Sequence, residues 1–90
     1  MKNSPWILLD TETTGFKKPI FTVELAAQRM NGWERDGAPF RRLLNHGREI
    51  PPEACRVHGY TREILDRDGD LPSEVYKAFA KYVGKRPVVA

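Results

Sequence analysis

The chain has 90 residues, of which 40% are hydrophobic and 30% are charged, and its formal net charge is +3. These values fit one small soluble domain and exclude a disordered or membrane-embedded chain. The excess of basic residues permits a polyanionic partner but does not require one. The apolar run at residues 6–9 is too short for a signal peptide or a membrane span. Because Cys55 is the only cysteine, the chain forms no internal disulfide and is expected to be cytoplasmic.

The first predicted element is a strand that begins with four apolar residues, Trp6–Leu9, and ends in a cluster of acids and hydroxyls. Such a run is typical of a strand covered on both faces of an α/β sheet. Side chains alternate along a strand, so Asp10 and Glu12 project from the same face. The two carboxylates repel each other, and a cation with oxygen ligands, Mg²⁺ or Mn²⁺, would stabilise them. Taken alone, the pair favours a simpler interpretation, a strand that ends in a solvated polar turn.

Two further strands are predicted in the first half of the chain. Gly15–Pro19 is a loop, and residues 20–30 alternate between apolar and polar side chains as a second strand does. Asn31-Gly32 is a strong hairpin signal, with Asp36-Gly37 as a second turn nearby. A third strand follows at residues 40–45. The three strands are expected to form an antiparallel meander.

Helical signals begin near residue 50. A short helix opens at Pro51-Pro52, ends near His58-Gly59 and is predicted to carry Ala54, Cys55 and Val57 inward. Thr61 is a candidate N-cap for a second short turn through Leu65.

The last third of the chain contains a polar loop, a longer helix and an apolar strand. The loop covers residues 66–70, and the helix runs from Pro72 to Val83 with Gly84 after it. One stripe of that helix is expected to enter the core and contains Val75, Phe79, Tyr82 and Val83. Because domains seldom end within a strand, the final strand at residues 87–90 suggests a truncated or processed fragment.

Several segments together resemble one family. Residues 9–15 (LDTETTG) are similar to the first exonuclease motif of the DEDD superfamily, in its DnaQ-like (DNA polymerase III epsilon-subunit-like) branch. Residues 23–27 are similar to the next strand of that family, and residues 50–54 with 57–61 resemble its Pro-Glu-Ala and Val-His-Gly-x-Thr segment. Residues 87–90 resemble the strand that leads into the second exonuclease motif. The resemblance covers essentially the whole chain in sequence order.

The resemblance implies an RNase H-like mixed sheet of strand order 3-2-1-4-5. Residues 1–90 would be the N-terminal portion of the exonuclease domain, without its second and third motifs. The implied activity is 3′–5′ exonuclease cleavage, which releases nucleoside 5′-monophosphates from a single-stranded 3′ end of DNA or RNA. The implied cofactors are two Mg²⁺ or Mn²⁺ ions, with Asp10 and Glu12 as catalytic metal ligands.

Four further residues match positions that contact the substrate in that family. Thr13 would offer its main-chain N–H to the terminal sugar, and Phe16 would wedge against the terminal bases or pack in the core. Glu53 and His58 would contact the terminal nucleotide; without the resemblance, each would be interpreted as a helix-end residue. Glu24 is interpreted as structural.

Partners and alternatives remain open at this stage. A DNA polymerase subunit is one candidate partner, and an incomplete sheet would favour self-association. With two of four expected carboxylates, the fragment alone is expected to be inactive. The rival functions are a non-catalytic nucleic-acid-binding or assembly module and an aspartyl-phosphate phosphatase, which Glu12 disfavours. The other histidine, His46, is expected to be exposed.

Overall fold

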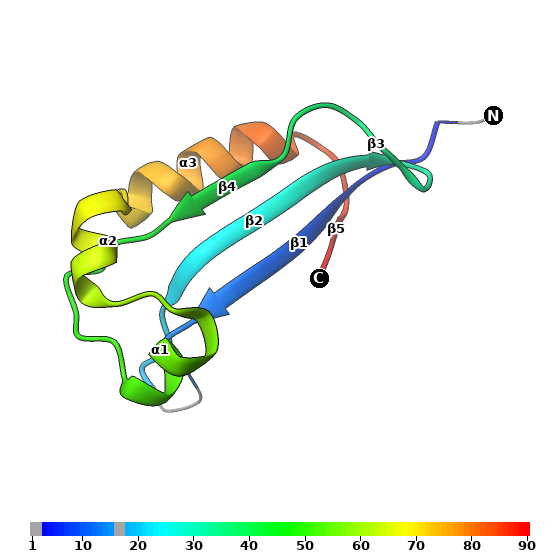
Figure 1. Ribbon diagram of the computed structural model, residues 1–90. Helices are drawn as coiled ribbons and strands as arrows, with labels where there is room; N and C mark the ends of the chain where they lie inside the picture. Colours follow the sequence, from blue (N-terminus) through cyan, green and yellow to red (C-terminus); the bar gives the residue numbers. More distant parts are fainter. Residues whose placement is uncertain (1–2, 16–17) are drawn as a thin grey trace.

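The computed structural model describes residues 3–15 and 18–90. The described residues form one mixed β-sheet and three α-helices (Figure 1). The strands are β1 (Pro5–Thr13), β2 (Thr22–Asn31), β3 (Glu34–Arg35), β4 (Phe40–Leu43) and β5 (Val88–Val89). The helices are α1 (Pro52–His58), α2 (Arg62–Asp68) and α3 (Pro72–Val83).

The sheet is organised around β2, which pairs antiparallel with β1 on one side and with β3 and β4 on the other. β5 lies on the free side of β1 and runs parallel to it, with Ile7 opposite Val88. The order β4–β2–β1–β5 confirms the predicted α/β class and the antiparallel meander. The parallel strand β5 makes the sheet mixed, as the resemblance implied. The short strand β3 was not predicted; it forms because the chain turns at Gly32 and pairs with the end of β2 before it leaves the sheet.

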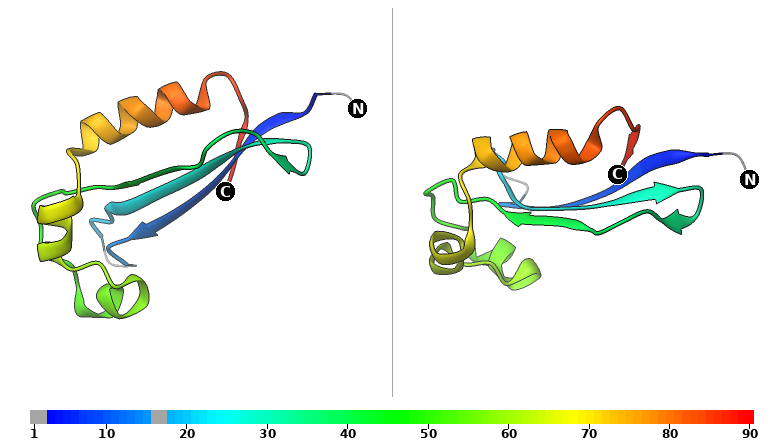
Figure 2. Two further views of the ribbon diagram at one scale, coloured as in Figure 1. Left: turned by 45° about the horizontal axis from the view of Figure 1, so that its top comes forward. Right: turned by 90° about the horizontal axis from the view of Figure 1, so that it is seen from above.

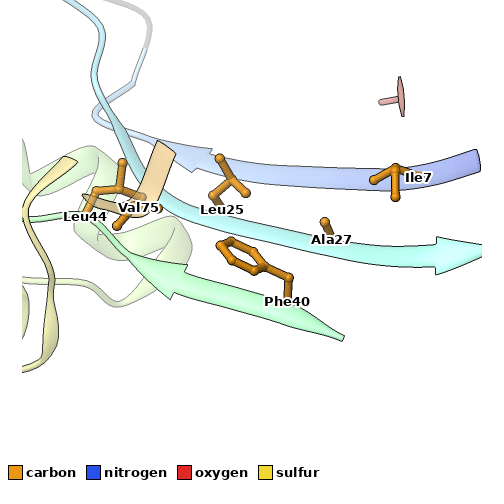
Figure 3. Close-up of a cluster of buried hydrophobic side chains, with 6 residues drawn as sticks. All are labelled: Ile7, Leu25, Ala27, Phe40, Leu44 and Val75. Atoms are coloured by element: carbon orange, nitrogen blue, oxygen red, sulfur yellow. The ribbon is translucent and has the colours of Figure 1, made fainter. Parts of the chain in front are cut away.

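The hydrophobic core lies between α3 and one face of the sheet (Figure 2). Its buried side chains follow the sheet as a continuous cluster (Figure 3), and they are Ile7, Leu25, Ala27, Phe40, Leu44 and Val75. Phe79, Tyr82 and Val83 of α3 pack against this cluster, which confirms the predicted apolar stripe. The rings of Phe79 and Tyr82 lie 5.7 and 5.4 Å from the ring of Phe40.

The opposite face of the sheet is open over β1. Leu8 is 46% exposed, and its neighbour Asp10 on the same face is also exposed. The prediction that β1 is covered on both faces is therefore wrong for the described chain, because α3 packs on the other face and α1 and α2 lie at the end of the strands (Figure 2). An apolar run in the sequence does not reveal which of its side chains is covered.

Local signals place α1 and α2 at that end of the sheet. Gly59 ends α1 with φ +78°, and its N–H donates to the Cys55 carbonyl oxygen at 2.7 Å. Thr61 caps α2, since its hydroxyl oxygen accepts from the Ile64 N–H at 3.3 Å. None of the described helices has the length and hydropathy needed to cross a membrane.

Two details of these helices differ from the prediction. Residues 66–68 continue α2 instead of forming a loop, supported by an ion pair between Arg62 and Asp66 one turn apart. Val57 is 80% exposed and does not point inward, although Ala54 is buried as predicted. A helix of seven residues buries only a narrow stripe, so neighbouring apolar positions differ in exposure.

Because adjacent residues of β1 lie on different faces, their substitution should lower the free energy of unfolding by different amounts. Ile7→Ala should lower the free energy of unfolding by about 2–5 kcal/mol, because Ile7 is completely buried and the substitution leaves a cavity. Leu8→Ala, on the open face of the same strand, should cost roughly 1 kcal/mol or less. Urea unfolding of both variants measures the difference, and equal costs would contradict the placement of the core.

Candidate active site

The acidic end of β1 lies opposite the beginning of β2. Asp10 pairs with Ala26 and Glu12 with Glu24, and the register then shifts so that Thr13 pairs with Thr22. This β-bulge leaves Val23 of β2 without a partner in β1. Bulges bend a strand and re-aim its side chains, and they are common beside active sites. The sequence carried no signal of the bulge.

A tight turn follows Thr13. Gly15 has φ +110°, which favours glycine, and its N–H donates to the Thr13 hydroxyl oxygen at 3.2 Å. The buried Thr14 donates its N–H to the Phe21 carbonyl oxygen at 2.9 Å and accepts from the Phe21 N–H at 3.0 Å through its hydroxyl oxygen. These bonds fix the turn to the start of β2.

A pocket of about 320 Å³ opens between this turn and α1. Among its lining residues are four that the sequence singled out: Glu12, Thr13, Glu53 and His58. The remaining lining residues are Gly15, Ala54 and Val57. We call it the β1–α1 pocket. The pocket thus combines carboxylates, a main-chain turn and a histidine from two separate segments of the chain. A few convergent polar groups in a pocket of roughly this volume are typical of a ligand site.

Of the other two predicted site residues, the structure describes only Asp10, which is not among the residues that line this pocket. Asp10 is on the same face of β1 as Glu12, two residues earlier, and lines a neighbouring apolar hollow that also includes Leu8. Phe16 falls outside the described residues. In residues 3–15 and 18–90 no cluster of three or more metal-ligating side chains occurs. Asp10 and Glu12 present two carboxylates on one face of β1, and oxygen ligands of this kind suit a hard cation such as Mg²⁺.

His58 is held by hydrogen bonds at both ring nitrogens. Its Nδ1 accepts from the Tyr60 N–H at 3.0 Å, so the neutral ring carries its proton on Nε2. Nε2 lies 3.1 Å from the Thr13 carbonyl oxygen, to which it donates. The ring also stacks on Tyr60, with centroids 5.2 Å apart. His58 therefore ties the end of α1 to the turn that follows β1.

A second network compensates the charge of Glu24. Like charges directly opposite in a sheet are destabilising, and Glu24 faces Glu12. Its Oε2 accepts from the Tyr60 hydroxyl at 2.7 Å and pairs with Arg41 Nε at 2.5 Å. Arg41 Nη2 also donates to the Tyr60 hydroxyl oxygen. These contacts agree with the structural interpretation of Glu24.

Tyr60 and Arg41 were missed by sequence reasoning, because no spacing rule links residues on three separate elements. Burial, followed by the hydrogen bond to Glu24, raises the pKa of the Tyr60 hydroxyl above its ordinary value. The hydrogen bond with Tyr60 is the main cause that raises the pKa of Arg41. Tyr60 thus connects the open face of the sheet to His58, and through His58 to Thr13.

The raised pKa of Tyr60 predicts a loss of stability at high pH. Above about pH 10 the tyrosine of the unfolded chain releases its proton, while Tyr60 in the folded chain keeps its own. Tyr60 therefore does not change the free energy of unfolding below about pH 10 and lowers it above that pH. Tyr60→Phe should make this fall smaller in urea unfolding at pH 9 and pH 11. Tyr76→Phe, at an exposed tyrosine of α3, should retain the full fall. Equal falls in the two variants would refute the assignment.

Residues 7–90 match the protein family described as Exonuclease. Among curated relatives, the DNA polymerase III subunit epsilon of Rickettsia prowazekii (strain Madrid E) is 32% identical over 85 residues, covering 92% of this chain and 37% of the relative. The corresponding subunit of Pasteurella multocida (strain Pm70) is 32% identical over 83 residues, covering 86% of this chain and 32% of the relative. The chain thus spans about a third of the length of these relatives.

The fold is also similar to solved structures. Exonuclease I from Methylocaldum szegediense matches with a TM-score of 0.84 at 20% identity, over 93% of this chain and 19% of that protein. This likeness supports the RNase H-like α/β architecture expected from the sequence. The family match and the epsilon-subunit relatives agree with the motif at residues 9–15. The chain therefore belongs to the Exonuclease family, in the DnaQ-like branch of the DEDD superfamily.

Proposed function

We propose that this chain is the N-terminal part of a metal-dependent 3′–5′ exonuclease domain that shortens single-stranded DNA. The observation that carries the proposal is the β1–α1 pocket, which gathers Glu12, Thr13, Glu53 and His58 beside the strand that bears Asp10. The relatives are named as DNA polymerase III epsilon subunits, which favours DNA over RNA and makes a polymerase subunit a reasonable partner.

The described residues fit half of a two-metal site. Asp10 and Glu12 project from the same face of β1, and Glu12 also lines the β1–α1 pocket. The two side chains would hold Mg²⁺ or Mn²⁺ through carboxylate oxygens. When bound, the cations supply an activated water and stabilise charge on the attacked phosphate. We infer that further acidic ligands lie outside residues 1–90, because two carboxylates alone bind such ions weakly. The products would be nucleoside 5′-monophosphates.

The remaining pocket residues would position the end of the strand. The tight turn at Gly15 exposes main-chain groups next to Thr13 without a side chain in the way, which permits close approach of a sugar. His58 fixes the Thr13 carbonyl group through its Nε2 hydrogen bond. Glu53, an exposed residue in the first turn of α1, offers its carboxylate to hydroxyl groups of the terminal nucleotide.

Substitution of the acids tests the function. In a complete exonuclease domain that contains this chain, 5′-labelled single-stranded DNA should shorten from its 3′ end in Mg²⁺ or Mn²⁺. Asp10→Asn or Glu12→Gln should each lower the rate by about 10²–10⁴-fold, the equivalent of several kcal/mol of lost charge stabilisation. Asp36→Asn makes the same chemical change at an exposed turn and should leave the rate unchanged.

Two results would contradict this assignment. If neither metal supports shortening by the complete domain, a non-catalytic nucleic-acid-binding module becomes the better explanation. If the 90-residue chain alone releases mononucleotides at a comparable rate, the site is not half of a larger one.

A further inference from the structure

A second pocket, of about 460 Å³, lies beside the same turn. Thr14 lines it, whereas its neighbours Thr13 and Gly15 line the β1–α1 pocket. Its other walls come from the segment before β2, from the segment between β4 and α1, and from Arg62 at the start of α2. We call it the Phe21 pocket. Since Thr14 bonds to both main-chain groups of Phe21, the position of this pocket is fixed relative to the candidate active site.

The Phe21 pocket carries a net positive charge. Its charged lining residues are Lys18, Arg48, Arg62 and one acid, Glu49. Arg62 is already paired, with Glu49 at 3.0 Å and with Asp66 at 3.6 Å. Within the part of the chain that the structure describes, Lys18 and Arg48 are in no ion pair, and both are exposed. Two uncompensated cations at one pocket favour an anionic ligand such as a phosphodiester.

An aromatic platform stands beside these cations. The guanidinium of Arg48 lies 4.5 Å from the ring centroid of Phe21. The ring of His46 packs on Phe21 at 4.9 Å, and its Nε2 bonds to the Thr22 carbonyl oxygen at 2.7 Å. The prediction that His46 is simply exposed is therefore wrong, because this histidine supports the platform. Aromatic and guanidinium planes beside basic side chains are the combination with which proteins bind single-stranded nucleic acids.

We propose that the Phe21 pocket binds a nucleotide of the substrate strand upstream of its 3′-terminal nucleotide. Lys18 and Arg48 pair with the phosphodiester, and the base stacks against Phe21 and the Arg48 guanidinium. The volume of the pocket is within the usual range for small-ligand sites and admits one nucleotide. The proposal rests on the proposed function, because it assigns this pocket to the strand whose end lies in the β1–α1 pocket.

A binding assay tests the contribution of the two cations. Fluorescence anisotropy measures binding of a fluorescein-labelled dT12 oligonucleotide to the 90-residue chain, in EDTA and over a series of salt concentrations. Lys18→Gln and Arg48→Gln should each weaken binding by about two- to fivefold. Each should also reduce the slope of log affinity against log salt by about 0.7, the value for one lost phosphate contact on a single strand. Lys81→Gln on α3 and Arg35→Gln on β3 remove the same charges elsewhere and should change neither quantity.

The stacking contact is tested separately with Phe21→Leu. This variant keeps an apolar side chain against His46 but has no aromatic face, and it should weaken binding by about fivefold or more with the salt slope unchanged. Thermal unfolding shows whether the variant remains folded. If it does not, the two charge variants still decide the proposal.

The outcomes separate this proposal from the proposed function. If the wild-type chain binds the oligonucleotide and the Lys18 and Arg48 variants bind as their controls do, the Phe21 pocket is not a strand contact, while the exonuclease assignment stands. If the wild-type chain does not bind the oligonucleotide, the proposal is overturned, and the Asp10→Asn assay decides the function by itself. In the complete domain, the charge variants should raise KM for an oligonucleotide and leave cleavage of a mononucleotide aryl ester unchanged; equal effects on both substrates would overturn the proposal.

Discussion

The pairing of β1 with β2 is the constraint on which the rest of the structure depends. It runs from Pro5 to Thr13 and assigns each residue of β1 to one of two faces. Ile7 enters the core beneath α3, while Asp10 and Glu12 point to the open face. A shift of one residue would bury the acids and expose Ile7. The hydrophobic core and the candidate metal ligands are therefore fixed by the same set of main-chain hydrogen bonds.

The cost of this arrangement is the placement of Glu24 directly opposite Glu12. Arg41 and Tyr60 offset that cost, because both bind the Glu24 carboxylate, whereas Glu12 lines the β1–α1 pocket. Tyr60 then holds His58 through its main-chain N–H. The contacts that compensate the charge of Glu24 thus also connect the sheet to α1 and to the turn at Thr13.

Sequence patterns predicted the parts of the structure that depend on local signals. The alternation in β2, the end of α1 near Gly59 and the apolar stripe of α3 are each set by residues close together in the chain. The order of the strands in the sheet was implied by the resemblance to the exonuclease family. The exposure of Leu8, the bulge at Val23 and the Tyr60 network depend on which distant element packs where, so no local pattern announces them. At the site, the resemblance identified Glu12, Thr13, Glu53 and His58, which line the β1–α1 pocket, but not the supporting contacts of His58, which depend on the three-dimensional arrangement.

We propose that Asp10 and Glu12 form the metal-binding half of a nuclease site. Titration of the 15N-labelled chain with Mn²⁺ tests it most directly, because the ion broadens amide signals near wherever it binds. The amides of residues 10–15 should broaden first, and Asp10→Asn should remove the effect. Broadening that begins instead at exposed acids such as Asp36 or Glu74, or that is unchanged in Asp10→Asn, would contradict it.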